Sequence, residues 1–485
     1  MKLQRQFSAA LLAAAFSATL AISGCNTDTG ITAIDNPPTL AAPLAANINL
    51  TGLGGAITQR DAANGLLSVG TPNGATANAA LNQATALGGR VTINNDGSFT
   101  YQAPLTGNTN DSFTYTLTNS GGSSTATVTI ALGAQAFFVK NDVTASGNGQ
   151  QATPFKTLAE AAAAANGVNA AEIVVFPGDG TTTGYNTAIT LGGNQTLRGF
   201  SPAATPLMTG PVVFTSGNKL QDVRINGTPA TASAVNAVGA SNGTIDRVAF
   251  SNCTTAGNLT DATGAWVLSN GSVQNMGLQG FVGISSTGSA SWGVNNYTFN
   301  NTTICAVCTG PTATAAHNLT INNSTFNGGG SSKILAQPNT NGTAVGLNVN
   351  NCTVNGGGTA LRGIDVTVQG TTAFTALLTS NNITGCTGQG IQVGVLGNSS
   401  ARIKFDRNRT LGNSPNFDLS ASFGGNSTGC LVYTNNTANQ FGLGQNSAGS
   451  TVNVEQFANF GTRNTGTLTA SGTITDVAAG FCGLP

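Results

Sequence analysis

Charged side chains, the usual carriers of acid–base and ion-binding chemistry, make up only 7% of this 485-residue chain, which has a single histidine. Their densest group is a short, mainly basic run containing Arg402, Lys404, Asp406 and Arg409. Apolar residues alternate with the first three of these, so the three should point outward from a strand. This pattern predicts a basic patch for an acidic glycan. The alternative is a solvated outer face whose charge resists stacking against another molecule.

A second, smaller charged group consists of Asp222, Arg224, Asp246 and Arg247. Glycoside hydrolysis requires two carboxyl groups that divide the acid and base roles. When the repeats described below are aligned on their apolar residues, no two carboxylates of adjacent repeats share a column. We therefore interpret this group as surface ion pairs, and the sequence assigns no catalytic residue.

Eight cysteines complete the reactive side chains. Cys25 stands near the N-terminus, and an odd number follow it, so at least one thiol should stay unpaired or pair between molecules. Cys305 and Cys308 form a Cys-x-x-Cys pair without the two further ligands that a zinc site needs. The spacing favours a local disulfide, and no metal site is predicted.

The elements that position these side chains are repeats ending in paired asparagines. Each pair follows an alternating apolar segment, and the first apolar residues are Trp292, Leu319, Leu347 and Leu378. Looser copies begin at Val223, Val248, Trp266, Ile403 and Leu431. A regular interval of this length indicates a solenoid, and the alternation is that of a strand. Each repeat should therefore form one coil of a parallel β-helix.

The neutral composition agrees with such a stack. Equivalent residues of neighbouring coils lie about 4.8 Å apart, so repeated like charges would repel, whereas amides and hydroxyls can hydrogen-bond along the stack. The formal net charge is zero. The chain therefore lacks the basic surface expected of a nucleic-acid-binding protein.

The first 25 residues have the features of an export signal. Lys2 and Arg5 precede an apolar stretch over residues 9–22, which is short for a membrane span. The stretch ends in Ile22-Ser23-Gly24-Cys25, which resembles the lipobox of bacterial lipoproteins. The resemblance implies cleavage before Cys25 and lipidation of its thiol. With Asn26 following, it also implies delivery to the outer membrane.

A small β-domain should follow a flexible tether. Strand-like alternation recurs at residues 91–93, 98–101, 111–117 and 125–132, separated by turn signals. The Asp96–Tyr101 and Asp111–Tyr115 segments and the entry Asp35-Asn36-Pro37-Pro38 resemble bacterial cadherin-like and immunoglobulin-like repeats. Calcium-binding relatives hold the ion with acidic clusters at the linkers. Here only Asp35 stands in that place, so calcium has little support.

The β-helix should begin with a capping helix. Thr157 and Glu160 have capping-box spacing before an alanine run. The Pro154–Ala161 segment and the following Ile173–Gly178 segment resemble the opening of right-handed parallel β-helix proteins of the pectin-lyase-like superfamily. The resemblance implies a fold shared with polysaccharide lyases and pectin-degrading hydrolases.

The sequence thus predicts an all-β protein: an N-terminal β-sandwich, then a right-handed, single-stranded parallel β-helix with a short N-terminal capping helix. The expected divisions are a lipoprotein signal peptide (1–24), a tether (25–38), the sandwich (39–133) and the β-helix with a C-terminal cap (134–485). The expected function is that of a lipid-anchored outer-membrane protein with an adhesive or structural role. It would bind glycan or a cell-surface partner without a cofactor. The alternative is a polysaccharide lyase or another carbohydrate-active enzyme.

Overall fold

The computed structural model describes residues 48–51, 62–66, 76–102, 104, 110–119, 122–131, 135–227, 233–283, 289–341, 343–413 and 417–485. The expected signal peptide, the tether and Cys25 lie outside these residues. Among the described residues, no helix is both long enough and apolar enough to cross a membrane.

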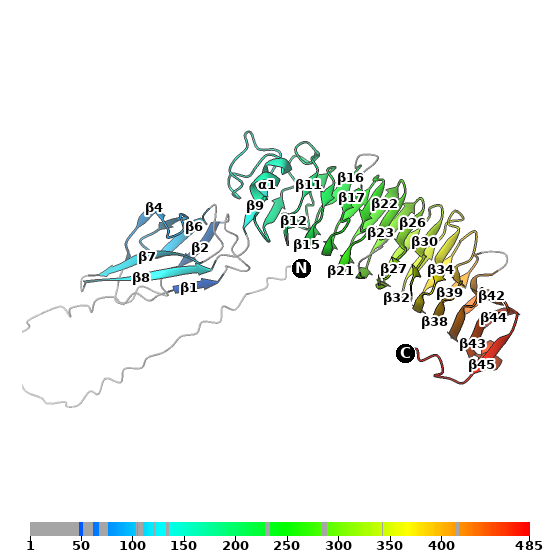
Figure 1. Ribbon diagram of the computed structural model, residues 1–485. Coiled ribbons are helices and arrows are strands. Elements are labelled where there is room, and N and C mark those ends of the chain that lie inside the picture. Colours follow the sequence, from blue (N-terminus) through cyan, green and yellow to red (C-terminus); the bar gives the residue numbers. More distant parts are fainter. Residues whose placement is uncertain are drawn as a thin grey trace, which may run out of the picture.

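Two four-stranded sheets form the N-terminal domain (Figure 1). One contains β1 (Ile48–Thr51), β8 (Gly122–Ala131), β7 (Asp111–Asn119) and β3 (Thr76–Ala77). The other contains β2 (Ala62–Leu66), β6 (Ser98–Gln102), β5 (Arg90–Ile93) and β4 (Ala80–Ala84). The alternating residues enclose one apolar core, which includes Val91, Phe99, Phe113 and Val128. The predicted strands and sandwich are confirmed.

Asp111 joins the two sheets of this domain from a fully buried position. Its carboxylate accepts hydrogen bonds from the Tyr101 hydroxyl at 2.7 Å and the Leu87 backbone N–H at 2.8 Å. Burial, together with the Asp111 carboxylate, raises the pKa of Tyr101. Because a buried carboxylate is tolerated only when it is well hydrogen-bonded, these donors fix the packing of one sheet on the other.

A parallel β-solenoid follows, in which strand stacks upon strand along a rod (Figure 1). Its first face is a fourteen-stranded sheet. Its strands are β9 (Ala136–Val139), β10 (Glu172–Val175), β12 (Thr196–Gly199), β15 (Ser216–Gln221), β18 (Ser241–Asp246), β21 (Thr263–Ser269), β24 (Ala290–Asn295), β28 (His317–Asn322), β32 (Ala344–Asn350), β35 (Ala373–Thr379), β38 (Ser400–Asp406), β41 (Thr428–Thr434), β43 (Thr451–Glu455) and β45 (Ile474–Val477).

The remaining strands form a twenty-three-stranded sheet that supplies two further faces. The second face contains β13 (Leu207–Met208), β16 (Arg224–Asn226), β19 (Ala249–Ser251), β22 (Ser272–Met276), β25 (Thr298–Thr302), β29 (Thr325–Asn327), β33 (Thr353–Asn355), β36 (Asn382–Thr384) and β39 (Arg409–Leu411). The third face contains β11 (Ile189–Thr190), β14 (Val212–Val213), β17 (Ser233–Asn236), β20 (Thr255–Asn258), β23 (Gln279–Gly283), β26 (Cys305–Thr309), β30 (Ser332–Ala336), β34 (Arg362–Gly370), β37 (Ile391–Val395), β40 (Leu419–Phe423), β42 (Thr437–Gln445) and β44 (Thr465–Ser471), with β27 (Thr312–Ala313) and β31 (Asn339–Thr340) beside it.

Helix α1 (Leu158–Ala165) lies at the first coil and has the predicted capping box. The Thr157 side chain accepts from the Glu160 backbone N–H, and the Glu160 carboxylate accepts from the Thr157 backbone N–H at 2.8 Å. Leu158 and Ala165 are buried in the core of the solenoid. The helix therefore covers apolar surface that the first coil would otherwise expose.

The corner between the first and second faces explains the asparagine pairs. In the nine successive coils from β15 to β41, one residue adopts a left-handed backbone there, with φ between 51° and 57°: Asp222, Arg247, Asn270, Asn296, Asn323, Asn351, Ser380, Arg407 and Asn435. Asn tolerates this backbone better than most residues. The second Asn of the early pairs occupies this corner position.

The register corrects three of the sequence alignments. Leu347 pairs with Ala376, not with Leu378, which lies in the next inward column. The copies placed at Val223 and Val248 begin after the corner, because the column of Trp266 before the corner holds Asn218 and Gly243 in these coils. Apolar alternation runs through both sides of a corner, so it does not mark the corner itself.

Near the C-terminal end, a column of buried asparagines follows the corner: Asn381, Asn408, Asn436 and Asn464. Successive side chains are linked from Nδ2 to Oδ1 at 2.9, 3.0 and 2.9 Å. Beyond them lie the 3-10 helix η2 (Phe457–Asn459) and helix α2 (Phe460–Arg463). Phe460 of α2 packs against Tyr433 and Phe441. Strands β44 and β45 then continue the coils to the end of the sheets.

Candidate functional site

The predicted basic patch does not form a single cluster. Arg402 and Lys404 lie on the outer side of β38 on the first face, and Arg409 lies beyond the corner on β39. The Arg409 guanidinium donates to the Asn382 side chain at 3.2 Å. The four residues are adjacent in sequence, but the corner at Arg407 directs them onto two faces.

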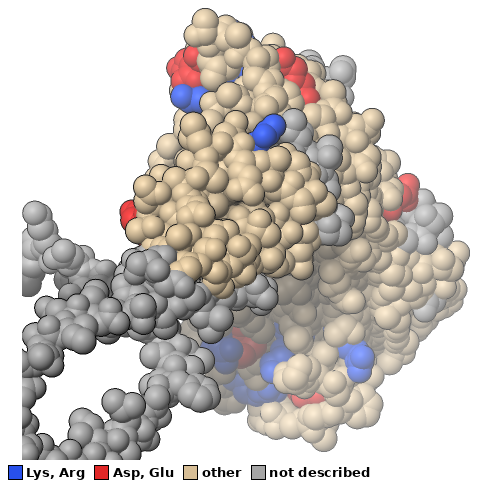
Figure 2. All heavy atoms as spheres, turned by 90° about the vertical axis from the view of Figure 1, so that its left-hand side faces the viewer, with Lys and Arg blue, Asp and Glu red and all other residues tan. Residues whose placement is uncertain are grey.

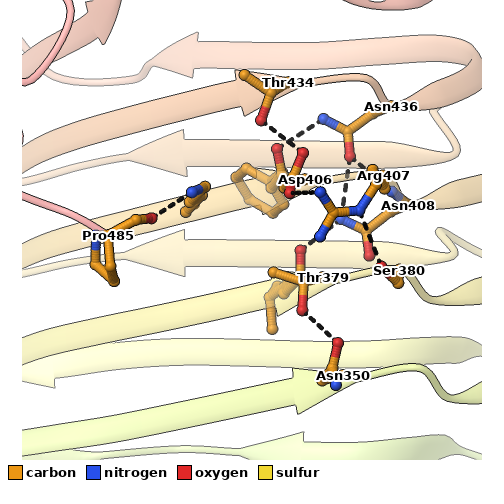
Figure 3. A network of polar contacts seen from close by, with 12 residues as sticks. Asn350, Thr379, Ser380, Asp406, Arg407, Asn408, Thr434, Asn436 and Pro485 are labelled. Atoms are coloured by element: carbon orange, nitrogen blue, oxygen red, sulfur yellow. Dashed lines mark hydrogen bonds and ion pairs between the residues drawn. The ribbon is translucent and has the colours of Figure 1, made fainter.

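Asp406 is only 6% exposed because its neighbours enclose its carboxylate. Arg407 forms an ion pair with it at 2.9 Å, and the Thr434 hydroxyl donates to it at 2.9 Å (Figure 3). The same guanidinium reaches the Ser380 hydroxyl on the preceding coil. Asp406 therefore holds adjacent coils together at the corner, and it does not lie in an exposed patch with Arg402.

The end of the chain crosses the first face beside Arg402 and Lys404. The Lys404 ammonium donates to the Pro485 carbonyl (Figure 3), and a disulfide joins Cys430 on β41 to Cys482. Between this segment and the sheet lies a cavity of about 360 Å³, lined in part by Phe374, Arg402 and Phe481. The chain itself thus covers part of the predicted patch.

Three members of the second charged group, Asp222, Asp246 and Arg247, form ion pairs. The Arg247 guanidinium contacts Asp222 through two nitrogens, at 2.6 and 2.9 Å, and also pairs with Asp246. These carboxylates raise the pKa of Arg247, with the Asp222 hydrogen bond the main cause. Arg224 is exposed on the second face. Because both carboxylates are bound to the same cation, neither is free to serve as an acid or base.

Two cysteine pairs lie together in the structure. Cys305 is joined to Cys308 on β26, and Cys430 to Cys482. Among the seven cysteines that the structure describes, three are free and buried: Cys253, Cys352 and Cys386. Burial raises the pKa of Cys352 and of Cys386 to about 11, so both are protonated at neutral pH.

Lys333 is a buried cation that sequence reasoning missed. Its side chain is 1% exposed on β30, and burial lowers its pKa to about 8, although the nearby Cys386 acts in the opposite direction. A Cβ at Gly329 would lie 2.6 Å from the Lys333 Nζ, so the glycine makes room for the ammonium group. In the sequence, Lys333 occupies an outward strand position, which gives no sign of burial.

Two hollows open on the third face, and sequence reasoning missed both. One, of about 380 Å³, lies against β26 and β30 and is lined by residues such as Gln279, Thr309, Gln337 and Gln369. The other, of about 270 Å³, lies against β37, β40 and β42 and is lined by Gln389, Gln392, Phe417, Ser420, Ser422 and Asn446, among others. We call the second hollow the amide groove. Among the described residues, none that lines this groove is charged.

Charge is sparse on the described surface as a whole. In the view of Figure 2, most of the described surface is uncharged, and the charged side chains form small separate groups. Within the described ranges, no three His, Cys, Asp or Glu side chains come together in a way that could hold a metal ion.

Comparisons with known proteins found similarities for both parts of the chain. Residues 35–131 match the family model of a bacterial Ig domain. The structure is similar to the catalytic unit of a thermostable GH87 α-1,3-glucanase from Streptomyces thermodiastaticus, with 12% identity, a TM-score of 0.33, and coverage of 80% of this chain and 75% of that one. It is also similar to the A-module of the Azotobacter vinelandii mannuronan C-5 epimerase AlgE4, with 12% identity, a TM-score of 0.29, and coverage of 71% and 100%.

No curated protein sequence matches the chain. The chain thus joins a segment that matches a bacterial Ig domain to a parallel β-solenoid.

Proposed function

We propose that this protein is a lipid-anchored surface rod that binds glycan chains through its solenoid and does not cleave them. The observation that supports the proposal is the third face, where two hollows are lined largely by amides and hydroxyls. Such groups exchange hydrogen bonds with sugar hydroxyls, and several small polar contacts in a concave site are typical of ligand recognition.

The state of the carboxylates favours binding over catalysis. Asp222 and Asp246 share Arg247, and Asp406 is enclosed by Arg407 and Thr434. An acid–base pair needs two carboxyl groups that face the substrate and have different pKa values. These three are instead used to hold one coil against the next.

The anchor rests on the sequence. Lipidation of Cys25 would attach the chain to the outer membrane, and the Ig-like domain would stand between the anchor and the solenoid. Stable anchoring takes more than one acyl chain, as a lipoprotein N-terminus supplies. The solenoid would then be held at a distance from the membrane, where a glycan of the cell surface or of a neighbouring cell could reach it.

The binding part of the proposal is tested by incubating the purified chain with neutral and acidic polysaccharides. Retention of the protein on an insoluble glycan, with no new reducing ends and no absorbance from unsaturated products, is the expected result. Release of products that is lost in an Arg402→Ala or Arg247→Ala variant would overturn the proposal in favour of an enzyme.

The anchor is tested separately in cells. The wild-type chain should partition with the outer membrane and be accessible to added protease on intact cells. A Cys25→Ser variant should move to the soluble fraction. A wild-type chain that is soluble in the periplasm would remove the anchor from the proposal without affecting glycan binding.

A further inference from the structure

We infer that the amide groove on the third face is the sugar-binding site and that it takes a neutral sugar residue, not an acidic one. This inference rests on the proposed function and deepens it. It also replaces the basic run at Arg402 as the site of recognition. The reasons are the shape of the groove floor, the orientation of two glutamine amides, and the chemistry of the lining.

The floor of the amide groove is made of small residues in strict register. Gln392 pairs with Ser420, which in turn pairs with Gly442 on the following coil. Gly394 pairs with Ser422, which in turn pairs with Gly444. These two outward columns leave room above the sheet where larger side chains would fill it. Coils lie about 4.8 Å apart, so the floor extends along the rod on the scale of a sugar ring per coil.

The Phe417 ring forms one wall. A Cβ at Gly442 would lie 2.8 Å from the Phe417 ring, so the glycine allows the ring to lie close over the backbone. The position of the ring is supported by the adjacent Asp418, whose carboxylate accepts from the Asn439 and Asn413 backbone N–H groups at 2.8 and 3.1 Å. An aromatic face at the side of a polar hollow suits the apolar C–H face of a pyranose.

A chain of hydrogen bonds fixes the amide of Gln389. The Arg362 guanidinium donates to Gln389 Oε1 at 3.1 Å and to Asp365 at 3.0 Å. The Asp365 carboxylate also accepts from the Ser332 hydroxyl at 2.8 Å. Because a guanidinium can only donate, Oε1 must face Arg362, and the Nε2 hydrogens of this groove-lining side chain remain for a ligand oxygen.

Gln392 supplies a hydrogen-bond acceptor, whereas Gln389 supplies a donor. Its Oε1 is buried and has no hydrogen-bond partner among the described residues. A buried acceptor without a partner costs free energy, and a donating sugar hydroxyl would recover it once the amide turns its Oε1 toward the groove. The groove therefore offers an oriented donor, an unsatisfied acceptor and several hydroxyls, which match sugar hydroxyls that both donate and accept.

The absence of charge from the lining decides the class of sugar. A uronate carboxylate would lose its hydration in the groove without gaining a cation in return, because no Lys or Arg is among the described residues that line it. Arg362 is itself paired with Asp365. A neutral hexose residue meets no such cost.

The test is titration calorimetry of the purified full chain with neutral gluco- and manno-oligosaccharides and with an oligouronate of matched length. A neutral oligosaccharide should bind, and the oligouronate should bind at least about tenfold more weakly. Phe417→Ala and Gln392→Leu should each weaken neutral-sugar binding about tenfold. Ser422→Tyr should abolish it by filling the groove from a half-buried position. Arg402→Ala, the matched control on the first face, should change nothing.

The outcomes separate the two proposals. Binding of an oligouronate that is lost in Arg402→Ala and kept in Phe417→Ala and Ser422→Tyr would overturn the groove assignment and leave glycan binding standing. Failure of every glycan to bind would overturn both. Thermal unfolding of each variant shows whether it is folded. If Gln392→Leu does not fold, Ser422→Tyr still tests the site.

Discussion

At nine successive corners between the first and second faces, one residue takes a left-handed backbone and the next points into the solenoid. Asparagine serves both positions, for different reasons. Asn351 holds the backbone and exposes its amide, whereas Asn408 is buried and bonds to protein groups on both sides. An amide that donates and accepts satisfies two coils at once, which no apolar residue could do.

Replacing Asn408 by Ala should therefore be costly. Its Nδ2 donates to the Leu378 carbonyl and to Asn436, and its Oδ1 accepts from the Asn381 side chain and backbone. The substitution leaves several buried groups unsatisfied and should lower the free energy of unfolding by about 3 kcal/mol. Urea denaturation measures this.

Asn350→Ala is the control for that experiment. Asn350 is exposed, and its side chain accepts a surface hydrogen bond from the Thr379 hydroxyl. Its loss should cost less than about 1 kcal/mol. An equal loss of unfolding free energy in the two variants would show that the buried asparagine column stabilises the protein no more than a surface asparagine does.

Lys333 gives the solenoid a dependence on pH. Burial lowers its pKa to about 8, against roughly 10.4 for an exposed lysine. Between these values the unfolded chain binds more protons than the folded one, so this residue makes stability rise with pH. Below pH 8, Lys333 is protonated in both the folded and the unfolded chain, so the full free-energy cost of burying its charge remains.

Lys333→Met should therefore stabilise the protein at pH 7 by about 2–3 kcal/mol and lose this advantage as the pH rises to 10. The thiols of Cys352 and Cys386 titrate near pH 11 in the parent, but they are present in both proteins, so their contribution largely cancels in the difference. Urea midpoints measured from pH 7 to 10 provide the test. A stability difference between Lys333→Met and the parent that stays constant from pH 7 to 10 would refute the lowered pKa of Lys333.

Among the elements, helix α1 depends most directly on local sequence. It spans only Leu158–Ala165, and helices this short are marginal in isolation. The capping box of Thr157 and Glu160 satisfies its first donors, and packing of Leu158 on the core holds it in place.

Thr157→Ala should weaken this helix by about 1 kcal/mol without unfolding the coils behind it. Hydrogen exchange of residues 158–165 should become faster by several-fold, while exchange in β12 stays the same. Thr183→Ala, at an exposed loop position, serves as the control. Unchanged exchange in Thr157→Ala would mean that packing alone holds the helix.

At the scale of the whole molecule, each coil of the solenoid contacts only its neighbours, so the two ends decide where unfolding begins. Helix α1 covers the first coil. At the other end, the Cys430–Cys482 disulfide ties the last residues back across the first face. The two half-cystines lie 52 residues apart, so the crosslink restricts a long loop of the unfolded chain.

Cys482→Ser should therefore destabilise the final coils by about 4 kcal/mol on the loop-entropy model. Limited proteolysis should cut the variant within residues 451–485 while the parent resists. Cys308→Ser is the control, because its partner is only three residues away and the loop it closes is short. Equal resistance of the Cys482→Ser variant and the parent would contradict the prediction.

The sequence by itself determined the architecture of the protein. The sandwich strands, the capping box and the coil repeat all follow from local alternation and turn residues. These signals act over a few residues, and the stack repeats them, so Trp292, Leu319 and Leu347 align as their spacing predicts. The pairing of Asp222 and Asp246 with basic residues also agrees with their spacing.

Only the tertiary structure decided which side chains meet. Alternation continues on both sides of a corner, so it could not place Leu378 in its register or separate Arg402 from Arg409. The burial of Lys333, the path of the chain end over Lys404, and the amide groove all depend on contacts between residues at least one coil apart in the chain. Sequence patterns record which way a side chain points from its own strand. They do not record what the neighbouring coil places beside it.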